Sequence, residues 1–553
     1  MRALTAPLYE LSEFEEIRKL LKKPGKYAAL TGCVESQKLH MAYGLSEGLR
    51  CRLIVTFSDQ RMKELQEDYR FYDRNTTCFP ARDVIFYQAD IHGNQLTKER
   101  IRCFRRMMEG RPFTVVTTFG SLLAPQIPLS VFRDNVITVS CNGSLDEKKM
   151  AEELVKLGYE NVYQVEAPGQ FSIRGGIIDI FDLTEENPYR IELWGDDVES
   201  IRSFDVQSQR SIEKLSSITI YPACELILTE EQLKKGMERI EKESKRFSEK
   251  LRKEFKTEEA HRVEEQMNTL KEEVFAYKSL ANLDGYVRYF YEDTVSFLNC
   301  LDVENSIVFL DEPARIREHA SAVELEFRES MSHRLEKGYI LPGQADFLYS
   351  VAEVTARMSA FRLASLAALD LKGGLLKPDW KADISAKSIS SYNNSFEALV
   401  SDLQRYKKNG YRVLLLSGSR TRAKRLAADL SEDGLTSFYT EDPDREIKPG
   451  EIMTFYGRVF RGFEYPLLKF AVISESDIFG AEKKKKKKKK QYEGSKINDF
   501  SELSVGDYVV HENHGLGIYQ GIEKVEVEKV VKDYIKISYR DGGILYVLAT
   551  GLD

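Results

Sequence analysis

The segment that most constrains this chain is a turn near its N-terminus that has the outline of a phosphate-binding loop. A working loop reads G-x-x-x-x-G-K-[ST] and lies between a strand and a helix. Gly32 fills the first glycine position and Lys38 fills the lysine position, between a short apolar run and a helix-like stretch. Gln37 replaces the second glycine, and Leu39 replaces the hydroxyl residue that would bind magnesium.

Both replacements remove a working part of the loop. The second glycine lets main-chain N–H groups close on a phosphate, and the hydroxyl group is a ligand for the metal. The pattern therefore predicts a nucleotide-hydrolase fold that no longer binds Mg-ATP tightly. A chance occurrence of Gly32 and Lys38 at this spacing is the alternative interpretation.

An apolar run that ends in two acids, residues 306–312, has the form of a Walker B element. In such an element an Asp holds magnesium and a Glu positions the attacking water. Here these residues are Asp311 and Glu312, and we expect Lys38 to face them across a helicase-like sheet. The sequence thus predicts a degenerate, non-catalytic nucleotide site made of Gly32, Gln37, Lys38, Leu39, Asp311 and Glu312.

Composition excludes several classes of protein. A net charge of −7 does not indicate a generally basic nucleic-acid binder. No apolar run is long enough to span a bilayer, and the first residues lack the apolar core of a signal peptide. The seven cysteines are scattered without a C-x-x-C pair, which is typical of reduced thiols in a cytosolic protein and argues against a cysteine zinc site.

The alternation of segments predicts a multidomain α/β protein. Strands are expected at 27–30, 53–57, 114–118 and 136–139, in the rhythm of a parallel sheet. The predicted units are an α/β domain at 1–144, a mostly-β insert at 145–225, a helical hairpin with the remainder of the first domain at 226–360, a small α/β domain at 361–480, a linker at 481–497 and a small β-barrel at 498–553.

Three segments carry a resemblance to a known family. They are FSIRGGIIDIF at 171–181, the stretch at 462–480 and VVHENHGLGIYQGI at 509–522. Together with the degenerate loop they resemble the N-terminal half of Mfd, the bacterial transcription-repair coupling factor, over essentially the whole chain. The resemblance implies a UvrB-like degenerate helicase half with an insert, followed by a CarD-like domain that interacts with RNA polymerase.

The resemblance also implies two partners. The insert is similar to the surface that binds UvrA, with Arg174 as a contact and Phe171 and Phe181 as apolar companions. The C-terminal domain is similar to one that docks on the RNA polymerase β subunit by pairing an exposed strand with a partner strand. The candidate residues are Val509, Val510, His511, His514, Leu516, Ile518 and Tyr519.

Two departures from the family are expected. UvrB has a tyrosine-rich hairpin that probes damaged DNA, whereas the corresponding segment here is short, with only Phe86 and Tyr87 as paired aromatic residues. Family members continue into a DNA-translocating ATPase that uses ATP and magnesium, and nothing here matches a functional loop of that motor. We therefore expect no cofactor and no catalysis in this chain.

The favoured hypothesis is an adaptor that binds stalled RNA polymerase and recruits UvrA for nucleotide excision repair of the transcribed strand. One alternative is an active DNA-dependent nucleoside triphosphatase that uses Lys38, Asp311 and Glu312. Another is a nonspecific DNA-binding protein that acts through Lys483–Lys490, an uninterrupted run of lysines that otherwise serves as an extended tether.

Overall fold

A seven-stranded parallel sheet forms the centre of the computed structural model, which describes residues 1–82, 95–276, 283–291, 293–371, 373–479, 503–511, 515–527, 530–538 and 544–548. Its strand order is β15-β1-β14-β13-β2-β4-β3, and every neighbouring pair is parallel. The strands are β1 (Tyr27–Thr31), β2 (Cys51–Thr56), β3 (Thr77–Phe79), β4 (Phe113–Thr118), β13 (Ser306–Asp311), β14 (Arg362–Leu366) and β15 (Trp380–Asp383).

Helices connect these strands and cover the sheet, as the parallel arrangement requires. The strands β4, β13 and β14 are buried throughout, as strands covered on both faces must be. The helices of this unit are α1 (Arg2–Thr5), α2 (Ser12–Leu20), α3 (Glu35–Leu45), α4 (Asp59–Tyr69), α5 (Gln95–Met108), α6 (Phe119–Leu123), α12 (Pro313–Glu336), α13 (Pro342–Ala345) and α14 (Val351–Met358).

The sheet corrects two predicted boundaries. The strand expected at 136–139 is β5 (Ile137–Ser140), which pairs antiparallel with β12 (Ser217–Ile220) outside the parallel sheet. Strands β14 and β15 lie beyond the predicted boundary at residue 361, yet both pair with β1. The second α/β unit therefore begins near β16 (Lys387–Ser388), the first strand of its own sheet.

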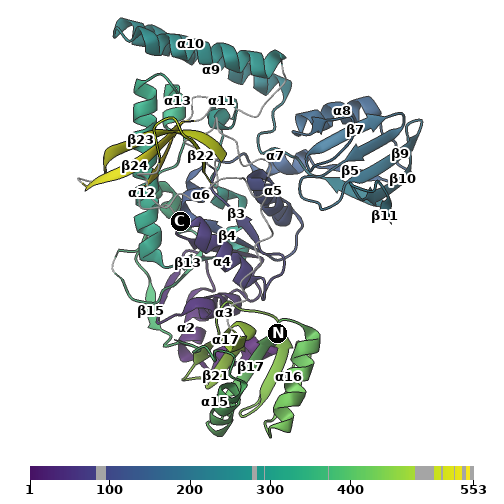
Figure 1. Ribbon diagram of the computed structural model, residues 1–553, viewed down its shortest axis with the longest axis vertical. Coiled ribbons are helices and arrows are strands. Elements are labelled where there is room, and N and C mark those ends of the chain that lie inside the picture. Colours follow the sequence, from purple (N-terminus) through teal and green to yellow (C-terminus); the bar gives the residue numbers. More distant parts are fainter. Residues whose placement is uncertain are drawn as a thin grey trace.

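The insert is a six-stranded sheet that projects to one side of the central sheet (Figure 1). Its order is β11-β10-β9-β8-β7-β6, and α8 (Glu147–Lys156) contacts β6 and β7. The β5–β12 pair brings the two ends of the insert together. The strands are β6 (Glu160–Asn161), β7 (Gln170–Arg174), β8 (Ile177–Ile180), β9 (Tyr189–Trp194), β10 (Asp197–Phe204) and β11 (Ser211–Leu215).

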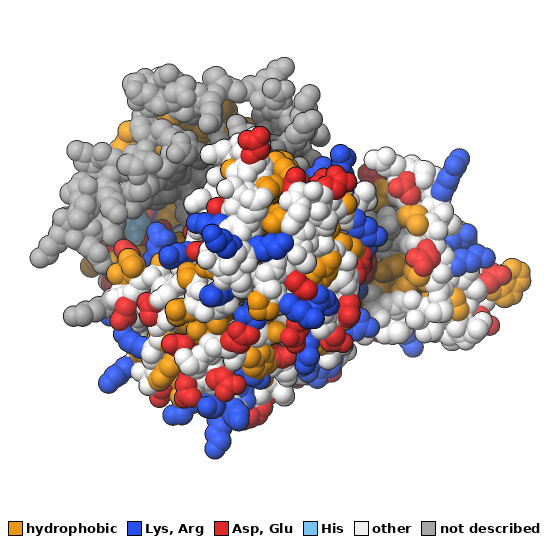
Figure 2. Space-filling view, turned by 90° about the horizontal axis from the view of Figure 1, so that it is seen from below, with side chains coloured by type: hydrophobic (Ala, Val, Ile, Leu, Met, Phe, Trp, Pro, Cys, Tyr) orange, Lys and Arg blue, Asp and Glu red, His pale blue; other side chains and the backbone are white. Residues whose placement is uncertain are grey.

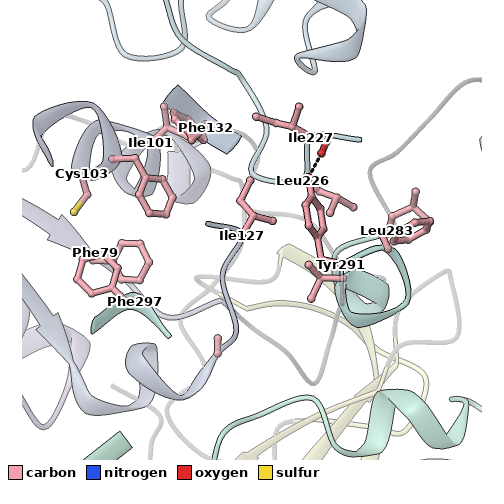
Figure 3. Packing of buried hydrophobic residues seen from close by; sticks show 14 of the residues in the cluster. Phe79, Ile101, Cys103, Ile127, Phe132, Leu226, Ile227, Leu283, Tyr291 and Phe297 are labelled. Atoms are coloured by element: carbon pink, nitrogen blue, oxygen red, sulfur yellow. Dashed lines mark hydrogen bonds between the residues drawn. The ribbon is translucent and has the colours of Figure 1, made fainter. Parts of the chain in front are cut away.

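A buried arginine fixes the point at which the chain returns from the insert. Arg100 is fully buried and donates to Glu225 Oε1 at 2.8 Å, Pro80 O at 2.6 Å and Gln126 Oε1 at 2.9 Å. Apolar residues on both sides continue this contact, and Figure 3 shows Leu226 and Ile227 beside Ile127 and Tyr291. The insert is thus joined to the sheet by a satisfied buried ion pair within one continuous core.

Two long helices occupy the segment that was predicted to hold a helical hairpin. They are α9 (Glu230–Lys253) and α10 (Thr257–Lys271), which contact each other and lie at the top of Figure 1. Along α9 an apolar stripe is buried at Met237, Ile240, Phe247 and Leu251. The stripe faces the partner helix, which accounts for it without a ligand.

The second α/β unit lies at the opposite end of the molecule (Figure 1). Its sheet order is β16-β20-β21-β17-β19-β18, and its core is shared with the first unit through residues such as Leu39, Phe463 and Phe470. Its elements are α15 (Phe396–Lys408), β17 (Arg412–Ser417), α16 (Arg420–Glu432), β18 (Ser437–Tyr439), β19 (Ile452–Tyr456), β20 (Phe463–Tyr465), β21 (Phe470–Ser474) and α17 (Glu475–Phe479).

The C-terminal residues form an antiparallel sheet in the order β22-β23-β24-β25. Closure into the predicted barrel is not seen in the strands that the structure describes, which pair only as neighbours in this order. Within the described ranges, no helix has the length and apolar character to cross a membrane. The strands are β22 (Tyr508–His511), β23 (Gly515–Val527), β24 (Val530–Ser538) and β25 (Ile544–Leu548).

Candidate nucleotide and partner-binding sites

The structure brings Lys38 together with both acids of the Walker B-like strand. Lys38 extends from α3, and its Nζ lies 2.8 Å from Asp311 Oδ1 and 2.5 Å from Glu312 Oε1. Arg61 Nε lies 3.1 Å from Asp311 Oδ2, and Thr56 Oγ1 donates to the same oxygen at 2.9 Å. Two cations and two carboxylates therefore neutralise one another where a nucleotide phosphate and its metal would bind.

Because the network is buried, the charges of its side chains interact strongly. The Lys38 side chain is 6% exposed and that of Asp311 is 4% exposed. Burial opposes the charge of Lys38, yet the two carboxylates outweigh it and raise the pKa of Lys38 above its ordinary value. Burial likewise opposes the charge of Asp311, but Lys38 and Arg61 outweigh it and lower the pKa of that carboxyl. Both groups are held in their charged forms.

The turn at Gly32 is shaped by packing inside the protein. Gly32 has a φ of +67°, and a Cβ there would lie 2.8 Å from Asp383 Oδ1. The N–H groups of Gly32 and Cys33 donate to the carbonyls of Ala368 at 3.2 Å and Ala367 at 3.1 Å. A glycine is needed here for backbone geometry and close approach, so its presence does not require a phosphate.

The two residues that break the loop pattern have structural roles. Gln37 is fully buried, and its Oε1 accepts from the N–H of Val34 at 3.1 Å. Its Nε2 donates to the hydroxyl of Tyr465 at 3.0 Å, on β20 of the second α/β unit. Leu39 is 2% exposed within the core that joins the two units. Through these two residues the turn and α3 make buried contacts with the second α/β unit.

The insert places its three predicted contact residues differently. Phe171 is fully buried and Phe181 is 5% exposed, so both rings belong to the core; their predicted role as surface companions is corrected. Arg174 is 40% exposed, lies 3.3 Å from Asp179 Oδ2 and stands 5.4 Å above the ring of Tyr163. Of these three residues, only Arg174 exposes its side chain to solvent.

The face that carries Arg174 extends along neighbouring strands. The register pairs Arg174 with Ile177 and Ile177 with Glu192, so these side chains share one face. Along β9 the same face carries Arg190 and Trp194, and Trp194 is 80% exposed. Arg190 binds both oxygens of Asp179, at 2.7 and 2.8 Å, which fixes the base of this surface.

The C-terminal candidates divide between core and surface. Val509 and Tyr519 are buried, Ile518 is partly buried, and Val510 and Leu516 are 55% and 60% exposed. His511 ends β22, paired with Gly515, whereas His514 lies outside the described residues. Within the part of the chain that the structure describes, β22 is an edge strand, as the docking prediction requires.

Main-chain groups of β22 point to the open edge. Tyr519 N–H donates to Asp507 O at 2.8 Å, which makes 507 and 519 a hydrogen-bonded pair. Because such pairs alternate along an antiparallel ladder, the main-chain groups of Tyr508 and Val510 face away from β23. Both side chains are more than half exposed.

Two family matches agree with this division of the chain. Residues 137–226 match the UvrB interaction domain, and residues 503–553 match the CarD-like/TRCF RID domain. The transcription-repair-coupling factor of Bacillus subtilis is 33% identical over 483 residues, which are 87% of this chain and 40% of that protein. The factor of Staphylococcus aureus strain MRSA252 is 27% identical over 558 residues, which are 100% of this chain and 47% of that protein.

The chain is similar to the N-terminal portion of transcription-repair-coupling factors. It spans less than half the length of these two curated relatives. The first match begins at β5, which supports the assignment of β5 to the insert and not to the parallel sheet. The second match covers the edge strand β22 and the three strands that follow it.

The sequence analysis did not single out several residues that the structure places on these surfaces. Tyr163, Arg190 and Trp194 share the face of Arg174, and the alternation in YRIELW was the signal that placed the last two. Tyr508 begins the edge strand, and its exposure follows from the same two-residue period. Tyr465 gave no sequence signal, because its partner Gln37 lies 428 residues away.

The remaining predictions concern the cysteines, a metal site, the lysine run and the pair of aromatic residues. All seven cysteines are free thiols in the structure. No cluster of metal-ligating side chains occurs among the described residues. The lysine run, Phe86 and Tyr87 lie outside the described ranges.

Proposed function

We propose that this chain is the partner-binding part of a transcription-repair coupling factor, acting in the bacterial cytoplasm. Its insert recruits UvrA through the face of Arg174, and its C-terminal sheet docks on the RNA polymerase β subunit through β22. The observation that carries this proposal is that both family-matched domains present exposed contact groups. The nucleotide-like site, in contrast, is filled by its own ion pairs.

The proposed UvrA surface combines a guanidinium with aromatic rings. Arg174 and Trp194 are exposed on one face, and Tyr163 is 84% exposed beneath the guanidinium of Arg174. Arginine and aromatic residues contribute disproportionately to binding at protein interfaces. This chemistry supports recognition of an acidic group on UvrA by Arg174.

Replacement Arg174→Glu is expected to weaken UvrA binding at least tenfold, about 1.4 kcal/mol, because it reverses the charge of an interface anchor. The variant should remain folded, since Arg190 still binds both oxygens of Asp179. The measurement is biolayer interferometry with purified UvrA.

Lys149→Glu is the matched control, because it makes the same charge change on α8, a helix that contacts β6 and β7 of the insert. The control should bind UvrA as the unmodified chain does. Absence of UvrA binding by the unmodified chain, or equal losses in both variants, would contradict the proposed surface.

The proposed polymerase contact is a strand addition. In that mode main-chain hydrogen bonds supply affinity, and side chains at alternate positions supply specificity. Tyr508 and Val510 offer both, because they are exposed and their main-chain groups face the open edge. This geometry supports a partner strand that lies against β22.

Val510→Pro is expected to abolish binding to the isolated polymerase β subunit, because proline lacks the N–H that would pair with the partner strand. The substitution leaves the β22–β23 ladder intact, since the N–H of residue 510 faces away from β23. Val510→Thr keeps the N–H and the branched shape, and should retain most of the binding. The two variants are compared by pull-down, and equal binding would exclude strand addition at this edge.

A further inference from the structure

The loop between β19 and β20 presents an aromatic ring flanked by arginines. Phe460 is 62% exposed, and Arg458 and Arg461 on either side of it are exposed. Val459 between them is fully buried. The loop therefore packs against the protein through one residue and directs the other side chains to solvent.

The main chain of this loop is anchored to the first α/β unit. The N–H of Phe460 donates to Asp68 Oδ1 at 2.7 Å, and the N–H of Arg461 donates to Ser36 Oγ at 3.0 Å. Ser476 Oγ donates to the carbonyl of Phe460 at 3.1 Å. Asp68 is 8% exposed, so a buried carboxyl holds the exposed loop in place.

Further arginines line the same junction. Gly457 lies against Phe71, because a Cβ at residue 457 would fall 2.3 Å from Phe71 Cε2. Arg74 and Arg420 lie 5.6 and 4.4 Å from the centroid of the Tyr456 ring, and donate to its hydroxyl at 3.0 and 3.2 Å. The end of α4 thus runs beside residues 456–460.

Most of these arginines have no carboxylate partner. Among the described residues, no acidic group lies within ion-pair distance of Arg74, Arg458 or Arg461, whereas Arg420 is paired with Glu441 at 3.1 Å. On the face shown in Figure 2, basic and acidic side chains are interspersed, as is usual for a solvated surface. A group of unpaired arginines around an exposed ring therefore differs from that background.

We propose that this arginine–aromatic patch, made of Arg74, Tyr456, Arg458, Phe460 and Arg461, binds single-stranded nucleic acid. Guanidinium groups pair with phosphates in a bidentate geometry. An exposed ring held by its main chain is a platform for an unpaired base, and a duplex keeps such base faces stacked inside. An acidic peptide would use the charges and leave the ring without a partner. This activity is separate from the proposed binding of UvrA and polymerase.

The test is fluorescence anisotropy with a labelled oligothymidylate of about twelve nucleotides, a length within the usual range of such sites. Lys483–Lys490 are replaced by glutamine in every protein, so that the lysine run does not contribute. Arg458→Glu/Arg461→Glu is expected to lower affinity at least tenfold. It should also reduce the slope of log affinity against log salt concentration by about 1.4, because each of the two lost phosphate contacts accounts for about 0.7. Phe460→Ala is expected to lower affinity roughly fivefold or more.

The matched control is Lys407→Glu/Lys408→Glu, which makes the same charge change on exposed residues at the end of α15. It should leave oligothymidylate binding unchanged. Equal losses in the control and the patch variants, no loss in Phe460→Ala, or equal competition by polyglutamate would each overturn the proposal. UvrA binding is measured for the same variants and should be retained in all of them. A negative result with oligothymidylate then concerns the arginine–aromatic patch alone and not the proposed function.

Discussion

Lys38→Met is expected to lower the free energy of unfolding by about 3–5 kcal/mol, the usual effect of removing one partner from a buried ion pair. The change leaves the buried Asp311 with Arg61 as its remaining ion-pair partner and removes the lysine that pairs with Glu312. Methionine keeps most of the side-chain volume, so packing is conserved. The measurement is urea unfolding followed by circular dichroism.

The double variant Lys38→Met/Glu312→Gln is the control for charge balance. Removing the carboxylate in the Lys38→Met background is expected to destabilise less than removing it alone, with a coupling of about 0.5–3 kcal/mol. Additive effects would contradict a coupled network. They would also remove the physical reason for the raised pKa of Lys38.

The same variant decides between the adaptor and the nucleoside triphosphatase hypotheses. A ligand that binds only the folded state stabilises it by RT ln(1 + [L]/Kd) and therefore raises the melting temperature. We expect Mg-ATP to leave the melting temperatures of the unmodified chain and of Lys38→Met unchanged, with no lysine-dependent ATP hydrolysis in the presence of DNA. A shift or turnover that disappears in Lys38→Met would establish Lys38 as a phosphate ligand.

His40 is expected to make the stability of the chain fall in mild acid. Its Nε2 lies 2.8 Å from Leu4 O and its Nδ1 lies 2.9 Å from the hydroxyl of Tyr465, an arrangement that fits the neutral ring. Burial lowers the pKa of His40 from 6.5 to about 4. The folded chain therefore resists protonation where the unfolded chain accepts a proton.

The sign follows from this lowered pKa. The contribution of the neutral ring is fully present above pH 6.5 and is lost as the pH falls toward about 4. The loss by about pH 5 is roughly 2 kcal/mol, since each pKa unit corresponds to 1.36 kcal/mol. Asp68 and Asp477 act in the opposite direction, because burial raises the pKa of each to about 6.

The comparison with His40→Gln isolates the histidine. Glutamine offers both a donor and an acceptor but does not titrate, while Asp68 and Asp477 contribute equally to both proteins. We expect the unmodified chain to lose about 2 kcal/mol more than His40→Gln between about pH 7.5 and about pH 5, measured by urea unfolding. Parallel pH profiles would show that His40 is solvated or charged in the folded chain.

The local pattern was enough to predict most elements. The strands expected at 27–30, 53–57 and 114–118 are β1, β2 and β4, and all join one parallel sheet. The strand at 136–139 was given to the wrong sheet, because periodicity identifies a strand and does not name its neighbour. The boundary at 361 failed for the same reason, since β14 and β15 pair with β1 from more than 330 residues away.

The site predictions show the same limit. Arg174 is exposed as expected, whereas Phe171 and Phe181 are core residues. An apolar residue in a strand fits equally well against a core or a partner, and only the packed sheet shows which face is covered. The edge position of β22 likewise depends on the order of four strands, which no local pattern specifies.

By itself the sequence determined that the phosphate loop lacks a second glycine and a metal-binding hydroxyl, because these are properties of residue type at fixed spacing. Only the tertiary structure decided what replaced them. Gln37 became a hydrogen-bond partner of Tyr465, and Lys38 became the centre of a buried ion network. Both roles depend on partners hundreds of residues away, which approach only when the parallel sheet and the second unit pack together.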